Sequence, residues 1–144
     1  RPLVQVGGDV FGWQPLRDGR TLVWLADATG HGASAALLTT LCTLLFNHGC
    51  DTETEPGAIL RAVNREFFEV FHGRSFMTAC CAAIDGEGTL VFSSAGHPAL
   101  LVRRADGRVE SVGAHGTVLG VFTLVVLLRD SVRETYAATA LPPT

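Results

Sequence analysis

The fold that we expect depends most on residues 21–38, which read TLVWLADATGHGASAALL. Their first six residues are apolar or β-prone and follow the turn signal Asp18-Gly19, which predicts a β-strand. The strand ends at Asp27, a glycine turn follows, and apolar residues then recur at helical spacing through residues 32–46. An acidic turn therefore connects a buried strand directly to a buried helix.

On either side of this stretch the chain is predicted to form strands, then two helices, then strands again. Short β-prone runs surround Gly7-Gly8, the first helix stops at Asn47-His48-Gly49, and Pro56-Gly57 opens a second helix. That second helix has one apolar stripe, formed by Ile59, Leu60, Val63, Phe67 and Phe71. Further strands are predicted at residues 77–84, 89–94, 99–103 and 109–112. Because strands and helices do not alternate regularly, we expect an α+β layered fold with mainly antiparallel strands.

Length and composition favour a single compact domain over residues 1–144. The chain is 47% hydrophobic and 17% charged, and its net charge is −3. It therefore has no basic face of the kind that binds nucleic acid or anionic lipid. The longest nearly uncharged apolar stretch, residues 117–128, is too short for the roughly 20 residues of a membrane span, and we expect one or two buried strands there. No signal segment opens the chain, Arg1 indicates a fragment of something longer, and we expect a cytoplasmic setting.

The cysteines and histidines give little support to a zinc site or a thiol nucleophile. The four cysteines form no CxxC pair, and we expect buried free thiols at Cys42, Cys50, Cys80 and Cys81. The histidines lack paired metal-ligand spacing; they are His31, His48, His72, His97 and His115. Since His97 lies in the turn Ala95-Gly96-His97-Pro98, a structural role is favoured for it over a catalytic one.

Two aspartates lie where predicted strands meet glycines. Asp9 follows Gly7-Gly8, and Asp27 ends a wholly apolar strand. An unpaired carboxylate is costly there unless water or a cation receives it. Mg²⁺ and Mn²⁺ bind oxygen ligands, and Ala28 offers a backbone carbonyl. The alternative is that each aspartate is an ordinary cap or turn residue.

A dinucleotide-binding loop is the rival interpretation of the same turn. Residues 30–35, GHGASA, match G-x-G-x-x-A between a strand and a helix. That fold also needs a second parallel strand after the helix, whereas residues 46–50 look like a helix end. No thiol-phosphatase loop, nucleophile elbow or P-loop occurs in the chain.

Four motifs in order give the chain a resemblance to a known family. GGDVF at residues 7–11 and DATGHG at 27–32, followed by AALL at 35–38, are the first two. AGHP at residues 95–98 and VLGV at 118–121 are the others. Together they resemble the stage II sporulation protein E-like and sigma-B-regulator-like serine phosphatases, a branch of the type 2C metal-dependent phosphatases.

This resemblance implies an αββα sandwich of two mainly antiparallel sheets flanked by helices. It also implies two Mn²⁺ or Mg²⁺ ions that activate a bridging water to attack phosphoserine or phosphothreonine without a phosphoenzyme. Asp9 and Asp27 would bind metal through carboxylates and Ala28 through its carbonyl, while His31 would lie near the leaving group or the metal-bound water. The implied substrate is a phosphorylated bacterial regulator of the anti-anti-sigma type.

The end of the chain departs from that pattern. The family continues past a segment like Leu141-Pro142-Pro143 to a further aspartate ligand, so we expect an incomplete sandwich and weak or absent activity for these 144 residues. In one other alignment, which requires a deletion, Asp130 supplies this ligand. A catalytically degenerate domain that only binds a regulator is the alternative function. An edge strand left open by truncation suggests pairing of two chains into a homodimer.

Overall fold

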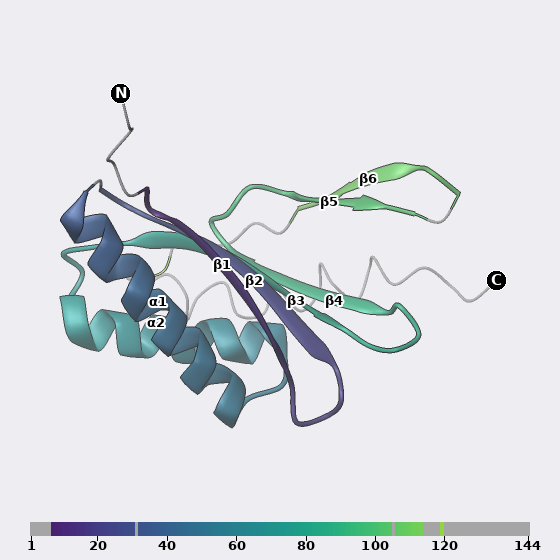
Figure 1. The fold of residues 1–144 in the computed structure, drawn as a ribbon, viewed down its shortest axis with the longest axis horizontal. Coiled ribbons are helices and arrows are strands. Elements are labelled where there is room, and N and C mark those ends of the chain that lie inside the picture. The colour runs from purple at the N-terminus through teal and green to yellow at the C-terminus, as the bar shows by residue number, and fades with distance from the viewer. Residues whose placement is uncertain (1–6, 31, 105, 114–118, 120–144) are drawn as a thin grey trace.

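The computed structural model describes residues 7–30, 32–104, 106–113 and 119, and the elements follow the predicted order. In chain order they are β1 (Asp9–Pro15), β2 (Thr21–Ala28), α1 (Ala33–Thr52), α2 (Pro56–Phe71), β3 (Met77–Ile84), β4 (Leu90–Ala95), β5 (Leu100–Arg103) and β6 (Val109–Val112). Figure 1 shows α1 and α2 on one side of the sheet that contains β1 to β4, with the β5–β6 hairpin on the other side. This arrangement confirms the mixed helix and antiparallel-sheet class.

The larger sheet has the strand order β1-β2-β3-β4, and each of its three strand pairings is antiparallel. Among the described residues β1 is therefore an edge strand. The chain continues from α1 into α2 and then returns antiparallel to β2 as β3. A dinucleotide-binding unit would need a parallel strand directly after α1, so this sheet excludes that interpretation.

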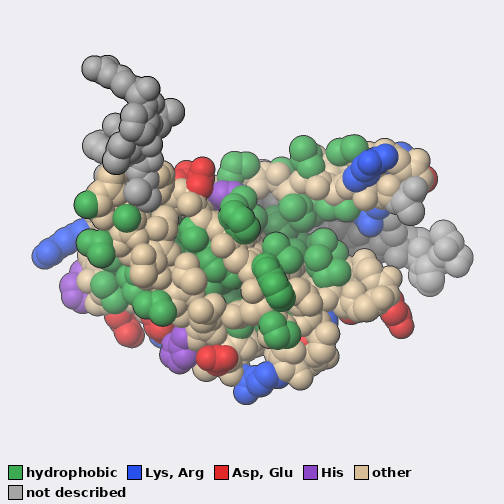
Figure 2. Space-filling model, viewed as in Figure 1, with side chains coloured by type: hydrophobic (Ala, Val, Ile, Leu, Met, Phe, Trp, Pro, Cys, Tyr) green, Lys and Arg blue, Asp and Glu red, His purple; other side chains and the backbone are tan. Residues whose placement is uncertain are grey.

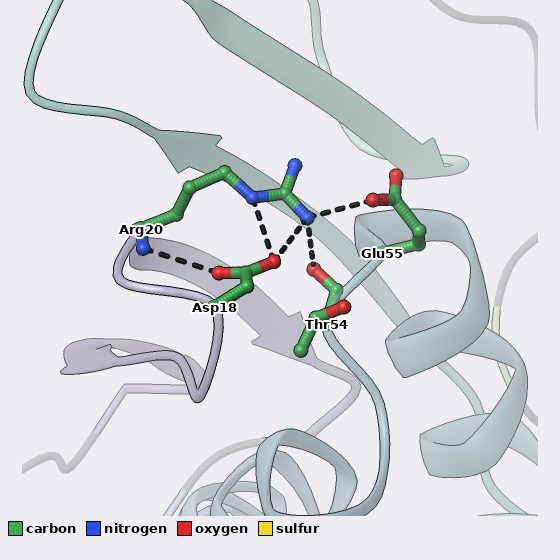
Figure 3. Close-up of polar contacts among 4 residues, drawn as sticks. All are labelled: Asp18, Arg20, Thr54 and Glu55. Atoms are coloured by element: carbon green, nitrogen blue, oxygen red, sulfur yellow. Dashed lines mark hydrogen bonds and ion pairs between the residues drawn. The ribbon is translucent and has the colours of Figure 1, made fainter.

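The turn between β1 and β2 is tied to the loop between the two helices (Figure 3). Arg20 Nη2 donates to Asp18 Oδ2 at 2.7 Å, to the Thr54 carbonyl at 3.1 Å and to Glu55 Oε1 at 2.6 Å. Gly19, with φ of 87°, supplies the left-handed residue that the predicted turn requires. One guanidinium thus connects the hairpin that carries Asp9 and Asp27 to the helical layer.

The main core lies between the helices and one face of the sheet. Trp24 of β2 stacks on Phe46 of α1, with ring centroids 4.4 Å apart and planes 3° from parallel. Gly12 of β1 lies opposite Trp24, and a Cβ there would be 2.5 Å from the indole ring. The missing side chain at position 12 therefore makes room for the largest ring of the core.

The structure corrects two details predicted for α1. The helix does not stop at Asn47-His48-Gly49 but continues to Thr52. Gly49 is buried, and a Cβ there would lie 3.3 Å from Ile59 of α2, so its small size serves helix packing instead of a stop. Leu37 and Leu44, which belong to the apolar stretch predicted to form a buried helix, are 74% and 59% exposed. Because α1 is apolar on several sides, packing on the sheet decides which stripe is buried.

By length and composition alone, α1 could cross a membrane, although the core helix of a soluble domain meets the same criterion. The helix packs against β1, β2 and α2. The predicted stripe of α2 is confirmed, since four of its members are buried and Phe71 is partly buried. All four cysteines are free and buried, as expected.

The other face of the sheet is only partly covered. The β5–β6 hairpin packs over Cys80, Ala82 and Phe92. Beyond it, hydrophobic side chains of β1 and β2 remain exposed on this face, namely Phe11, Trp13, Val23 and Leu25. Figure 2 shows hydrophobic side chains gathered along these strands and the hairpin. The β5–β6 hairpin is a second, two-stranded sheet on this face, and no helix covers it among the described residues.

Several predicted features lie outside the described residues. They are the short run at residues 4–6, His31, His115, Asp130 and all of residues 117–128 except Leu119. Leu119 is buried and exchanges two backbone hydrogen bonds with Met77 of β3, at 2.8 and 3.2 Å. Of the VLGV motif, Leu119 is therefore paired with the sheet.

Candidate metal centre

The two aspartates predicted as metal ligands lie directly opposite each other on neighbouring strands. The register of β1 and β2 pairs Asp9 with Asp27. Directly opposite residues of an antiparallel pair point to the same face, with Cβ atoms about 5 Å apart. In β2 the buried positions alternate with exposed ones, and Asp27 belongs to the exposed set that faces away from the helices. The site therefore lies at one end of the partly covered face.

This pairing of like charges is unfavourable without a counter-charge. Neither carboxylate has a hydrogen-bond or ion-pair partner among the described residues. The described ion pairs involve only Arg20, His48, Arg104 and Arg108 as cations. Two like charges directly opposite each other destabilise a sheet, whereas a cation bound between them would attract both carboxylates and so stabilise it.

Gly8 keeps the space beside these carboxylates open. The Ala28 amide donates to the Gly8 carbonyl at 3.0 Å, so the two backbones run close together. A Cβ on Gly8 would collide with the Ala28 carbonyl oxygen and lie 2.9 Å from Asp27 Oδ1. Two oxygens, one from each residue, thus converge on the place where any other residue would carry its side chain. The glycine is needed there for space, since its φ is not in the left-handed region.

The donor set fits a hard divalent cation. Asp9 and Asp27 offer carboxylates and Ala28 offers a carbonyl, all of them oxygen ligands of the kind that Mg²⁺ and Mn²⁺ prefer. Within the described ranges, no group of three His, Cys, Asp or Glu side chains is close enough to hold an ion. Waters and substrate oxygens commonly complete the shell of such ions, so the described part of the site is an open one.

A third strand adds a hydroxyl and an imidazole to this row. Thr78 of β3 lies directly opposite Asp27. Its Oγ1 is 2.9 Å from His97 Nδ1. The row Asp9, Asp27, Thr78 thus crosses three strands and ends at a histidine from the turn after β4.

Burial and charge act on His97 in opposite directions. Partial burial lowers the pKa of its imidazole, while the carboxylates of Asp27 and Asp9 both act to raise it. Burial prevails, and the pKa is below its ordinary value. A neutral imidazole at neutral pH keeps one ring nitrogen as a donor and the other as an acceptor.

The structure thus brings together Asp9, Asp27 and the Ala28 carbonyl. His31 lies outside the described residues, and its role near the leaving group stays a prediction. Thr78 was not singled out from the sequence, because a threonine inside a strand carries no local signal of function. His97 was noted in its motif, and only the pairing of β3 with β2 reveals that it lies beside the aspartates.

The chain is similar in sequence to a phosphoserine phosphatase and in structure to a protein with RsbU and RsbW domains. Over 123 residues the chain is 25% identical to the phosphoserine phosphatase RsbP of Bacillus subtilis (strain 168), covering 82% of this chain and 30% of RsbP. A solved structure of the RsbU and RsbW domains of Rv1364c from Mycobacterium tuberculosis matches with a TM-score of 0.68 and 32% identity, over 82% of this chain and 34% of that one.

A further structural match supports the fold alone. The PP2C phosphatase domain of SpoIIE from Bacillus subtilis matches with a TM-score of 0.66 and 19% identity, over 79% of this chain and 34% of that one. The chain thus spans about a third of the length of these relatives. The family model described as "Stage II sporulation protein E (SpoIIE)" matches residues 17–137. This match covers most of the sequence, and the chain belongs to the SpoIIE family.

Proposed function

We propose that the protein hydrolyses phosphoserine or phosphothreonine on a bacterial regulatory protein, and that it needs Mn²⁺ or Mg²⁺ to do so. The observation that carries the proposal is the unpaired Asp9–Asp27 carboxylate pair beside the Ala28 carbonyl. Membership of the SpoIIE family and the similarity to a phosphoserine phosphatase support the reaction type.

Each residue has a defined task in this reaction. Asp9 and Asp27 would hold the cations from two adjacent strands, and the strand pairing fixes their separation. Ala28 would add its carbonyl, and Gly8 keeps this oxygen accessible. When bound, two such ions activate a water as nucleophile and offset charge on the phosphoryl group. The rigid sheet holds the ligands in place, so little reorganisation is needed during the reaction.

We further propose a phosphorylated anti-anti-sigma-type protein as the substrate. Removing a phosphate takes away about 1.5 to 2 negative charges, which is enough to switch a charged binding surface. The relatives that support a regulatory partner are RsbP and the RsbU and RsbW domains of Rv1364c.

Hydrolysis of p-nitrophenyl phosphate tests the proposal, in this chain and in any longer natural polypeptide that contains it. In the longer polypeptide we expect turnover that depends on Mn²⁺ and is abolished by a chelator. Asp27→Asn should reduce it by at least about a hundredfold, since even the loss of outer-shell partners of a metal costs 10–100-fold. Asp51→Asn is the matched control, because Asp51 is an exposed aspartate on α1, in the layer on the opposite face.

A regulator-binding domain without turnover is the second candidate. It is favoured by the donor set itself, since the described residues place only two carboxylates at the site. Such a domain should bind the phosphorylated partner equally well with chelator present. Full Mn²⁺-dependent activity in Asp27→Asn would contradict the catalytic proposal; partner binding that persists with chelator, without any hydrolysis, would favour the binding domain.

A further inference from the structure

His97 interacts electrostatically with the carboxylates of both Asp9 and Asp27. It comes from the turn after β4, 70 positions along the chain from Asp27. Its neighbour in space is Thr78, which lies directly opposite Asp27 in the sheet. The imidazole therefore contacts the strand next to Asp27 and two strands from Asp9, although the turn that carries it begins only after β4.

Three separate contacts hold the turn that carries this imidazole. Ser94 Oγ, which is buried, donates to the His97 carbonyl at 3.3 Å. Gly96, with φ of 69°, forms a bridge with Ala79 of β3. Thr78 Oγ1 contacts the ring itself at Nδ1. A surface turn needs no such fixing of its side chain, whereas a group that contacts a ligand gains from being held in place.

The contact at Nδ1 also determines which ring atom is available. The tautomer in which the Thr78 hydroxyl donates to Nδ1 carries the ring proton on Nε2. In that tautomer Nε2–H is a donor for which the described residues offer no acceptor. A phosphoryl group held by cations at Asp9 and Asp27 would carry oxygens that accept a hydrogen bond from such a donor.

We propose that His97 is a substrate-binding residue of this site, whose Nε2 hydrogen-bonds a phosphoryl oxygen while Thr78 holds the ring through Nδ1. Thr78 is then a positioning residue. This inference rests on the proposed function, since it assumes a phosphoryl group at the Asp9–Asp27 pair. It adds a contact to the substrate that does not depend on metal coordination.

The test measures binding of inorganic phosphate in the presence of Mn²⁺, together with binding of Mn²⁺ alone, by calorimetry. Four variants form two pairs. His97→Ala removes the donor, while His97→Gln keeps an N–H near the position of Nε2. Thr78→Val removes the hydroxyl with little change in shape, while Thr78→Ser keeps it. His48→Gln is the control, because His48 is an exposed histidine of α1.

We expect His97→Ala to weaken phosphate binding about tenfold or more, the usual effect of losing a hydrogen bond to a charged group. His97→Gln should restore part of this affinity. Thr78→Val should weaken binding about threefold to tenfold, and Thr78→Ser by less. Affinity for Mn²⁺ alone should stay within about twofold of wild type in every variant that keeps its circular dichroism spectrum.

Each adverse outcome has a separate meaning. Unchanged phosphate affinity in both His97→Ala and Thr78→Val overturns the inference and leaves His97 as a turn residue. Loss of Mn²⁺ affinity in His97→Ala also overturns it, because the imidazole would then be a metal ligand. If His97→Ala does not fold, the phosphate and Mn²⁺ affinities of Thr78→Val and Thr78→Ser test the inference by the same criteria. If the wild-type protein binds no Mn²⁺, and binds no phosphate when Mn²⁺ is present, both the proposed function and this inference are overturned.

Discussion

Gly8 contacts the Ala28 carbonyl and lies beside the Asp27 carboxylate, with no room for a methyl group. We expect Gly8→Ala to push the start of β1 away from the end of β2. The free energy of unfolding should fall by about 1–3 kcal/mol, as for other overpacked sites. Mn²⁺ affinity should fall as well, because Asp9 follows directly in the chain. Urea unfolding and calorimetric Mn²⁺ titration measure the two effects.

Gly86→Ala is the matched control for this change. Gly86 lies in the turn between β3 and β4, its φ is not in the left-handed region, and a Cβ there meets nothing within 4 Å. It should leave both quantities within error of wild type. If Gly8→Ala bound Mn²⁺ as tightly as Gly86→Ala does, the space at residue 8 would have no part in the site.

At the scale of elements, Arg20 links the β1–β2 turn to the loop between α1 and α2 (Figure 3). Its side chain is only 18% exposed, so its hydrogen bonds are partly shielded from water. We expect Arg20→Gln to lower the free energy of unfolding by about 1 kcal/mol. Arg17→Gln should change it little, because the Arg17 side chain has no hydrogen-bond or ion-pair partner among the described residues.

The same variant has a defined pH dependence. The hydrogen bond from Arg20 holds the pKa of the Asp18 carboxyl below its ordinary value of 3.8. A carboxyl with a lowered folded-state pKa stabilises the fold above its ordinary pKa and loses this effect as the pH falls through the folded-state value. The difference between wild type and Arg20→Gln should therefore be constant from pH 7 to 5 and shrink below pH 4. A difference that grew in acid would contradict the Arg20–Asp18 interaction.

At the scale of the whole molecule, the buried cysteines lie in two separate hydrophobic layers, so the labelling of their thiols measures the opening of each layer. Cys42 and Cys81 lie in the core between helices and sheet, and burial raises the pKa of the Cys42 thiol to about 12. Cys80 lies on the other face, under the β5–β6 hairpin. A two-stranded hairpin is a weaker cover than two packed helices. We expect iodoacetamide to label Cys80 first and the other two only on global unfolding.

Mass spectrometry of the labelled protein along a urea series measures this order. Full unfolding in denaturant, where all four thiols should react, is the internal control. Simultaneous labelling of Cys80 and Cys81 would show that the hairpin opens only together with the main core. Rapid labelling of Cys42 in native conditions would contradict the burial of the helix–sheet interface.

The sequence by itself determined the order of strands and helices, because turn signals such as Asp18-Gly19 and the apolar stripe of α2 act locally. The cost of a carboxylate at the end of an apolar strand drew attention to Asp27, and the resemblance to the family predicted Asp9, Asp27 and Ala28 as metal ligands. Motif order was enough to indicate the family, and the family match agrees.

Only the tertiary structure decided which residues meet. The end of α1 and its buried stripe depended on α2 and the sheet, because an apolar helix has several faces that could pack. Strand register placed Asp9 and Thr78 on either side of Asp27, and a shift of one residue would have turned these side chains to the other face. Thr78 and His97 join the site through this register, a non-local pairing that no local pattern in the chain encodes.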